Sequence, residues 1–154
     1  MKSMNLSPLK GFNSFTKVYE QSLKVHFGNI SLQICFKPSN ILIKKKACNP
    51  ELIYFGVVAP KKLYKKAVVR NRIKRLLRVS LKEIFKDLAP KYDLSQIQIL
   101  VITWKGKTVT KPREIKLNEV KDNLFQALTY FLSKNSQLKK EKKRPNTDSS
   151  ISEI

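Results

Sequence analysis

The chain has 154 residues and carries 32 Lys and Arg against 11 Asp and Glu, which gives a formal net charge of +21 at pH 7. This charge is larger than solubility requires and favours a polyanionic partner. No run of about 18 apolar residues occurs and no apolar segment follows Met1, so the sequence predicts neither a membrane span nor a secretory signal. Cys35 and Cys48 lack the CxxC or histidine spacing of a metal site. We therefore expect no metal in the protein and free thiols in a reducing, cytoplasmic compartment.

The length suits one domain with two tails. We expect a flexible leader over residues 1–11, a folded domain over residues 12–134, and a disordered basic and polar tail over residues 135–154, where apolar residues are almost absent. At the start of the domain, Phe15, Val18 and Tyr19 recur at i, i+3 and i+4, a spacing that predicts a short helix.

Two strands are predicted before the most basic part of the chain. Apolar and polar residues alternate over 30–37, which is the period of a strand with one buried face. The run of β-branched and aromatic residues over 52–58 predicts a second strand. Residues 38–50 form a Lys-bearing connection between the two, in which residues 41–43 could extend the sheet.

A long basic helix is predicted from Ala67 to the Ala89-Pro90 pair. Residues 96–103, with the sequence QIQILVIT, are apolar on both faces toward their end and predict an interior strand. The basic helix is therefore expected to cross over between two strands. After a basic loop, apolar residues over 117–132 keep the helical period and predict a second long helix that covers the sheet.

The basic helix separates apolar from cationic residues at about 100° per residue. The apolar arc contains Val69, Ile73, Leu76, Leu77 and Ile84. The opposite side contains Asn71, Lys74, Arg75, Arg78 and Lys82, with Arg70 and Arg72 on the two flanks. A merely solvated helix face usually mixes Glu with Lys, whereas residues 61–78 contain no acid. Phosphates would relieve the repulsion along such a stripe, so a nucleic acid is the expected partner.

Residues 55–78, FGVVAPKKLYKKAVVRNRIKRLLR, resemble the signature of the bacterial ribonuclease P protein component. The parts of that signature are a strand at 55–58, Lys61-Lys62, Ala67-Val68, Arg70-Asn71-Arg72 and Lys74-Arg75. A weaker similarity at residues 14–19 and 92–93 extends the resemblance over roughly residues 12–132.

The resemblance implies an α+β fold: a small single-domain sandwich of helices and a mixed, mostly antiparallel sheet, in which a left-handed strand-helix-strand crossover carries the Arg-Asn-Arg helix. It also implies that the protein is a subunit of the ribonuclease P endoribonuclease, whose catalytic RNA removes the 5′ leader from precursor transfer RNA. The expected partners are therefore the ribonuclease P catalytic RNA and precursor transfer RNA. Mg²⁺ is expected mainly on the RNA subunit, and no catalytic residue is expected in the protein.

Carried over onto this chain, the contact with the catalytic RNA comprises residues on and just ahead of the basic helix. They are Lys61, Lys62, Lys65, Lys66, Arg70, Asn71, Arg72, Lys74, Arg75 and Arg78. A cleft between the first helix and the sheet is expected to bind the single-stranded leader, with Phe15, Tyr19 and Phe36 as stacking surfaces. The alternative is that Phe15 and Tyr19 only pin the helix to the core.

The residues also bear on other functions. His26 is the only histidine, and Asp87 and Asp93 are too isolated to bind two metal ions, so the residues do not indicate a protein catalyst. A DNA-reading helix would need base-specific side chains, and Asn71 is the only amide in the stripe. The main alternative is a structural or ribosomal-type RNA-binding protein, which would bind mature and precursor transfer RNA alike.

Overall fold

A mixed five-stranded sheet forms the centre of this computed structural model, which describes residues 5–9, 12–37, 39–43 and 45–135. In spatial order the strands are β1 (Asn5–Pro8), β6 (Leu52–Val58), β7 (Ile97–Trp104), β3 (Ile30–Phe36) and β2 (Leu23–Phe27). β3 is antiparallel to both β2 and β7, whereas β6 is parallel to both β1 and β7. The predictions for residues 1–4, 10–11 and 136–154 lie outside the described residues.

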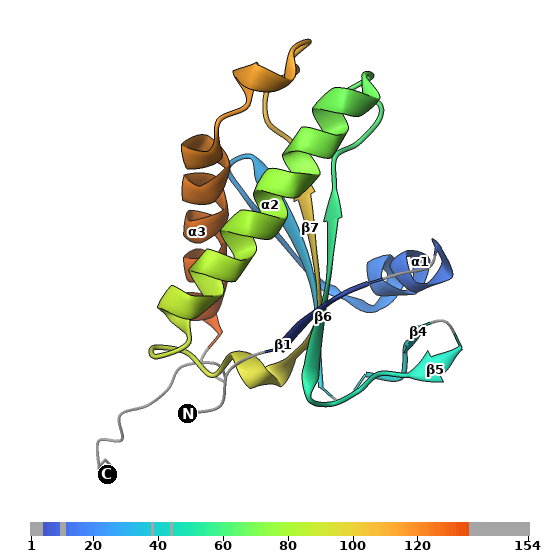
Figure 1. The fold of residues 1–154 in the computed structure, drawn as a ribbon. Coiled ribbons are helices and arrows are strands. Elements are labelled where there is room, and N and C mark those ends of the chain that lie inside the picture. The colour runs from blue at the N-terminus through green and yellow to red at the C-terminus, as the bar shows by residue number, and fades with distance from the viewer. Residues whose placement is uncertain (1–4, 10–11, 38, 44, 136–154) are drawn as a thin grey trace.

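Helices cover both faces of this sheet (Figure 1). On one face α2 (Ala67–Leu88) and α3 (Leu117–Lys134) lie side by side. On the other face lie α1 (Phe12–Gln21) and a small hairpin of β4 (Leu42–Ile43) and β5 (Lys46–Ala47). Two short 3-10 helices, η1 (Leu94–Gln96) and η2 (Pro112–Glu114), precede β7 and α3.

The apolar sequence of β7 places it between two cores, because all eight of its residues are buried. Leu100 and Ile102 contribute to the main core, which the sheet shares with α2 and α3. Ile99 and Val101 point the other way, into a smaller core that includes Val18 of α1. The prediction of an interior strand is therefore confirmed.

The elements with the clearest periodicity are also confirmed. The short helix around Val18, the strand over 52–58, the long basic helix and the second long helix all form where they were predicted. β6, α2 and β7 make the predicted crossover between two strands, which are parallel neighbours.

The N-terminal residues differ from the prediction. Residues 5–8 were expected in a flexible leader, yet they form β1 and pair in parallel with β6. Leu9 continues this contact, since its backbone N–H donates to the carbonyl of Phe55 at 2.7 Å. The pairing satisfies backbone groups at the outer edge of β6, which side-chain periodicity does not report. Because β1 adds a second parallel pair, the sheet is evenly mixed rather than mostly antiparallel.

Three further differences concern the first half of the sheet. β2 was not predicted, and it forms a hairpin with β3 through Gly28, whose φ of 58° suits glycine. Residues 41–43 do not extend the main sheet; the chain turns back at Lys45, φ 68°, to make the separate β4–β5 hairpin. β3 is buried on both faces rather than one, because α1 and the smaller core cover its polar side.

Candidate RNA-binding interface

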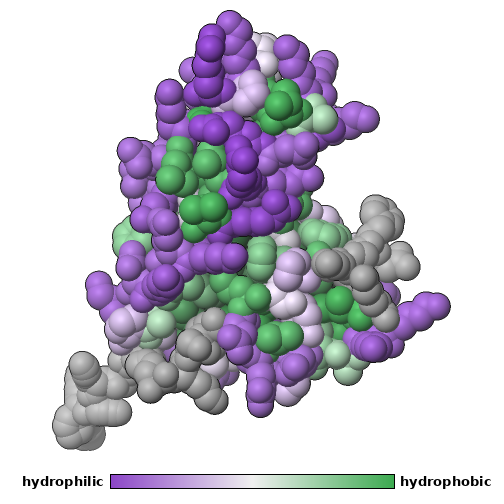
Figure 2. Space-filling view, viewed as in Figure 1, coloured by the Kyte–Doolittle hydropathy of each residue, from purple (hydrophilic) through white to green (hydrophobic). Residues whose placement is uncertain are grey.

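α2 presents a buried half and a cationic half. Nine of its 22 residues are buried, and they include all five residues of the predicted apolar arc. The opposite half faces solvent, and Figure 2 shows hydrophilic side chains gathered over this helix. The helical-wheel prediction is therefore confirmed for the buried side.

Five of the predicted contact residues line one surface groove of about 430 Å³ along α2: Asn71, Arg72, Lys74, Arg75 and Arg78. They lie close together because residues three and four apart share a helix face. Val68 of α2 and Pro112 of η2 complete the lining. The groove thus runs between α2 and the β7–α3 connection, with guanidinium and ammonium groups that suit phosphate.

Arg70 and Arg72 also bind the loops near the start of α2. Arg70 Nη1 donates to the carbonyl oxygens of Tyr64 at 3.0 Å and Lys65 at 2.9 Å. Arg72 Nε donates to the carbonyl oxygen of Ile115 at 3.0 Å. Both side chains are half-buried, so they are less accessible to a phosphate group than the exposed Arg75 and Arg78 are. A guanidinium has five N–H donors, and these bonds leave others for a phosphate.

The four predicted lysines ahead of α2 are exposed, but they do not line the groove. Lys61 and Lys62 follow β6, and Lys65 and Lys66 directly precede the helix. Between the two pairs Tyr64 is fully buried, and its hydroxyl donates to the carbonyl of Gly106 in the β7–α3 connection. The two connections lie at the same end of the sheet (Figure 1), and this bond joins them.

The N-terminal end of α2 adds to the positive potential. Its first turn contains no acidic residue, and the N-cap residue Lys66 makes no side-chain capping bond. Unpaired N–H groups and the helix dipole at such an end attract anions. Beyond Lys82 the charges are mixed, since Glu83 of α2 pairs with Lys121 of α3 at 2.8 Å. The first acidic residue of α2 is Glu83, so the exclusively cationic part of the helix extends to Lys82, which the wheel placed on the stripe and which does not line the groove.

The structure brings Phe15 and Tyr19 together over the sheet, as predicted. The Phe15 ring lies against Gly56 of β6, where a Cβ atom would come within 2.6 Å of it. Tyr19 is 37% exposed, and its hydroxyl makes a hydrogen bond with the Thr103 side chain. Burial raises the pKa of the Tyr19 phenol, and that hydrogen bond partly opposes the rise. Phe15 thus packs against the core, while Tyr19 both packs and faces solvent.

Phe36 was predicted to share this cleft, and its placement is a correction. Its ring stacks on Phe131 of α3, with centroids 6.0 Å apart, and it packs against the main core. Successive residues of a strand point to opposite faces, so Cys35 faces the α1 side and Phe36 faces the α3 side. Phe36 therefore does not stack beside Phe15 and Tyr19.

The described residues contain no group of three or more His, Cys, Asp or Glu side chains that could hold a metal ion. His26 Nδ1 lies 2.6 Å from Ser31 Oγ, a hydrogen bond that joins β2 to β3. Cys35 and Cys48 are free thiols, and burial raises the pKa of Cys35 to about 11. Over the same part of the chain, every helix is too short or too polar to span a membrane.

Two residues of the groove were missed by sequence reasoning. Val68 is 56% exposed although it is apolar, and Pro112 lies on a different element. The helical wheel gave a signal for Val68, which falls about 100° from Val69 and outside the apolar arc. No periodic signal could have placed Pro112, which comes 34 positions after Arg78 in the chain.

This chain is similar to known proteins in sequence and in fold. The family model for Ribonuclease P matches residues 5–129. A ribonuclease P protein component of Rippkaea orientalis is 29% identical over 122 residues, which cover 79% of this chain and 87% of that protein. One from a Cyanothece species is 34% identical over 124 residues, covering 77% of this chain and 90% of its own length. The structure of the Staphylococcus aureus RNase P protein has a TM-score of 0.51 at 18% identity, covering 80% of this chain and 94% of that one.

The last comparison shows a shared fold, and the other three concern the sequence itself. The matched residues include the strand, the Lys-Lys pair and the Arg-Asn-Arg helix that the sequence presents at 55–78. Because the family model spans well over half of the chain, this protein belongs to the ribonuclease P protein family.

Proposed function

We propose that this ribonuclease P protein serves transfer RNA 5′ processing through two surfaces, one for the catalytic RNA and one for the precursor's leader. The groove on α2 binds the RNA subunit through phosphate and sugar contacts. The α1 face of the sheet binds the single-stranded leader. Bond cleavage belongs to the RNA subunit, and the protein contributes binding and orientation.

The observation that carries the first part is the groove itself. Asn71, Lys74, Arg75 and Arg78 line it together, and no acid occurs in residues 61–78. Such a concentration of fixed positive charge costs repulsion in the free protein and gains counterion-release energy with RNA. Arg72 adds a donor and also fixes the loop that forms the opposite wall. Lys61, Lys62, Lys65, Lys66 and Arg70 extend the contact beyond the groove.

The second part is supported by the α1 face. Tyr19 offers a partly exposed ring, and Lys24 lies at the end of α1, since Lys24 Nζ donates to the Tyr19 backbone carbonyl at 2.7 Å. Gln33 Oε1, on the same face of β3, is buried without a hydrogen-bond partner among the described residues. An aromatic ring, a cation and an unpaired amide oxygen suit an unstacked nucleotide. Phe15 fixes the position of α1 and contributes little exposed surface.

Mg²⁺ would bind to the RNA in this scheme. The described part of the protein offers no cluster of carboxylates for such an ion, and hard cations of this kind are commonly held by phosphates. The free thiols of Cys35 and Cys48 suit the reducing cytoplasm, which we propose as the compartment.

A generic RNA-binding protein would use the same cationic helix without a processing partner. Family membership argues against that alternative. The two functions also differ in whether the protein discriminates between precursor and mature transfer RNA. A complex of this protein with ribonuclease P RNA should bind precursor transfer RNA more tightly than mature transfer RNA, whereas the RNA subunit alone should discriminate less. Equal gains in affinity for both transfer RNAs on adding the protein would support the generic role.

A further inference from the structure

The connection between β7 and α3, residues 105–116, is a second concentration of positive charge next to α2. Its five cations are Lys105, Lys107, Lys111, Arg113 and Lys116, and all of them are exposed. Its one acid, Glu114, is bonded within the connection, because Glu114 Oε1 accepts from the backbone N–H groups of Thr110 at 3.2 Å and Lys111 at 3.3 Å. Within the described part of the chain, no ion pair involves any of the five cations. The connection therefore presents unpaired positive charge to solvent.

Hydrogen bonds tie both ends of this connection to the residues around the start of α2. At one end the hydroxyl of Tyr64, which is fully buried, donates to the carbonyl of Gly106. At the other end Arg72 Nε donates to the carbonyl of Ile115 at 3.0 Å. Gly106 also packs on the Trp104 ring, where a Cβ atom would come within 2.7 Å of Cζ2. Both ends of the connection are therefore fixed before a partner binds, which lowers the conformational entropy lost on binding.

The groove on α2 separates the two cationic elements. Arg75 and Arg78 lie in the wall formed by α2, and Pro112 of η2 forms the opposite wall. Lys111 and Arg113 directly precede and follow Pro112 and are exposed, so each wall has cations in it or directly beside it. Figure 2 shows hydrophilic side chains over this end of the molecule, where Figure 1 places the connection and the first turns of α2. A phosphate backbone that enters the groove therefore meets positive charge from two elements.

We propose that the β7–α3 connection is a second binding element for the catalytic RNA, which contacts the phosphate backbone from the side opposite α2. Lys111 and Arg113 bind phosphate groups, and Tyr64 is the positioning residue that keeps them at the edge of the groove. Both cations gain electrostatic attraction to phosphate and release its counterions. This inference rests on the proposed function and adds to its first surface a wall that lies outside residues 61–78. It does not involve the α1 face of the sheet.

The test measures the affinity of the full-length protein for a bacterial ribonuclease P RNA over a range of salt concentrations. Lys111→Ala with Arg113→Ala should weaken binding about tenfold and reduce the salt slope by about two, because two phosphate contacts are lost. Lys86→Ala with Lys91→Ala is the matched control, since it removes two exposed cations at and just after the C-terminal end of α2. The control should keep the wild-type slope. Thermal unfolding checks that all variants fold.

Tyr64→Phe tests the positioning role, because it removes only the hydroxyl that bonds to Gly106 and keeps the buried ring and every charge. It should weaken binding about threefold, as expected for one lost hydrogen bond. In the variant that already lacks Lys111 and Arg113, Tyr64→Phe should lower the affinity no further, since Tyr64 acts through those two side chains. A merely structural role would give the same loss in both backgrounds.

Three results would contradict this account at different points. If Lys111→Ala with Arg113→Ala binds the RNA with the affinity and slope of the control, the connection is a solvated loop and the inference is wrong. Equal losses from Tyr64→Phe in both backgrounds would overturn its positioning role. If Arg75→Ala, in the wall formed by α2, leaves the affinity unchanged, the proposed function fails instead.

Discussion

Arg72 and Arg75 line the same groove but have different surroundings. Arg75 is exposed, whereas Arg72 is half-buried and donates to the Ile115 carbonyl at 3.0 Å. Arg75→Ala should weaken binding to the RNA subunit and reduce the salt slope of binding by about one, without changing thermal stability. Arg72→Ala should also lower the free energy of unfolding, by about 1 kcal/mol, because it removes a hydrogen bond.

Salt titrations of binding and denaturant unfolding measure the two effects separately. Lys86→Ala is the control, since Lys86 is an exposed cation of α2 outside the groove. If Lys86→Ala weakens binding as much as Arg75→Ala does, net charge and not the groove determines affinity.

Tyr64 should make the free energy of unfolding depend on pH in the alkaline range. Burial, with a smaller contribution from the charge of Glu119, raises the pKa of Tyr64 from its ordinary value of 10.0 to about 12. The unfolded state therefore loses this proton first. The contribution of the Tyr64 phenol to the free energy of unfolding is complete below about pH 10 and is lost as pH rises from about 10 to about 12. Unfolding free energies across this range should fall more steeply for the wild type than for Tyr64→Phe, and parallel curves would contradict the assignment.

At the scale of elements, the position of α1 depends on Gly56. A Cβ atom there would lie 2.6 Å from the Phe15 ring, so Gly56→Ala should displace the helix. We expect a loss of about 1 to 3 kcal/mol in the free energy of unfolding. The preference for precursor over mature transfer RNA should fall, while affinity for the RNA subunit should not change because α2 is untouched.

Phe15→Leu replaces the phenyl ring with a shorter side chain. It should therefore partly restore the stability of Gly56→Ala in the double variant. A double-mutant cycle of unfolding free energies measures this coupling. Additive losses would show that Phe15 does not pack on Gly56.

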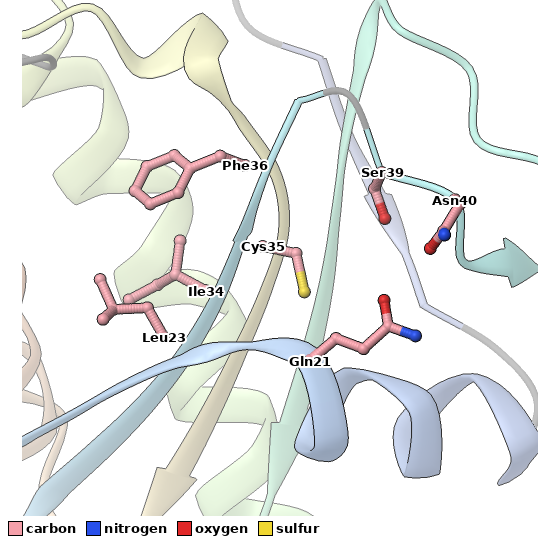
Figure 3. A pocket seen from close by; sticks show the side chains of 7 residues that line it. All are labelled: Gln21, Leu23, Ile34, Cys35, Phe36, Ser39 and Asn40. Carbon is pink, nitrogen blue, oxygen red and sulfur yellow. The ribbon is translucent and has the colours of Figure 1, made fainter.

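Sequence periodicity predicted the elements whose position in the fold is determined by burial of their apolar side chains. α2, α3 and β7 have long apolar patterns that bury them whatever their neighbours. β1 is held by backbone pairing with β6, which leaves no side-chain pattern to read. Phe36 lies on the face of β3 opposite α1 (Figure 3). The sequence alone did not show this, because the face that α1 covers is determined only when the sheet assembles.

The cationic stripe followed from residues 67–78 alone, since one helix carries it. The anchoring role of Arg72 did not, because the acceptor of its hydrogen bond is 43 positions away in the chain. Pro112 entered the groove for the same reason. Long-range contacts made by loops have no periodic signature, so they became visible only in the folded protein.

For the whole molecule, the formal charge of +21 should make stability depend on anions. A multivalent anion that binds only the folded groove raises the free energy of unfolding, by about 2.7 kcal/mol at one hundred times its dissociation constant. Sulfate should therefore raise the unfolding temperature more than sodium chloride at equal ionic strength. The difference should shrink when Arg75 and Arg78 are replaced by Ala, and equal effects of the two salts would indicate general screening.

The most direct test of the whole molecule is cleavage of a 5′-extended precursor transfer RNA at low magnesium concentration. Three samples are compared: ribonuclease P RNA alone, this protein alone, and the two together. Efficient cleavage at the mature 5′ end by the pair, and by neither component alone, is the expected result. Cleavage by the protein alone, or no effect of the protein on the RNA subunit despite tight binding, would contradict its role as the subunit that assists a catalytic RNA.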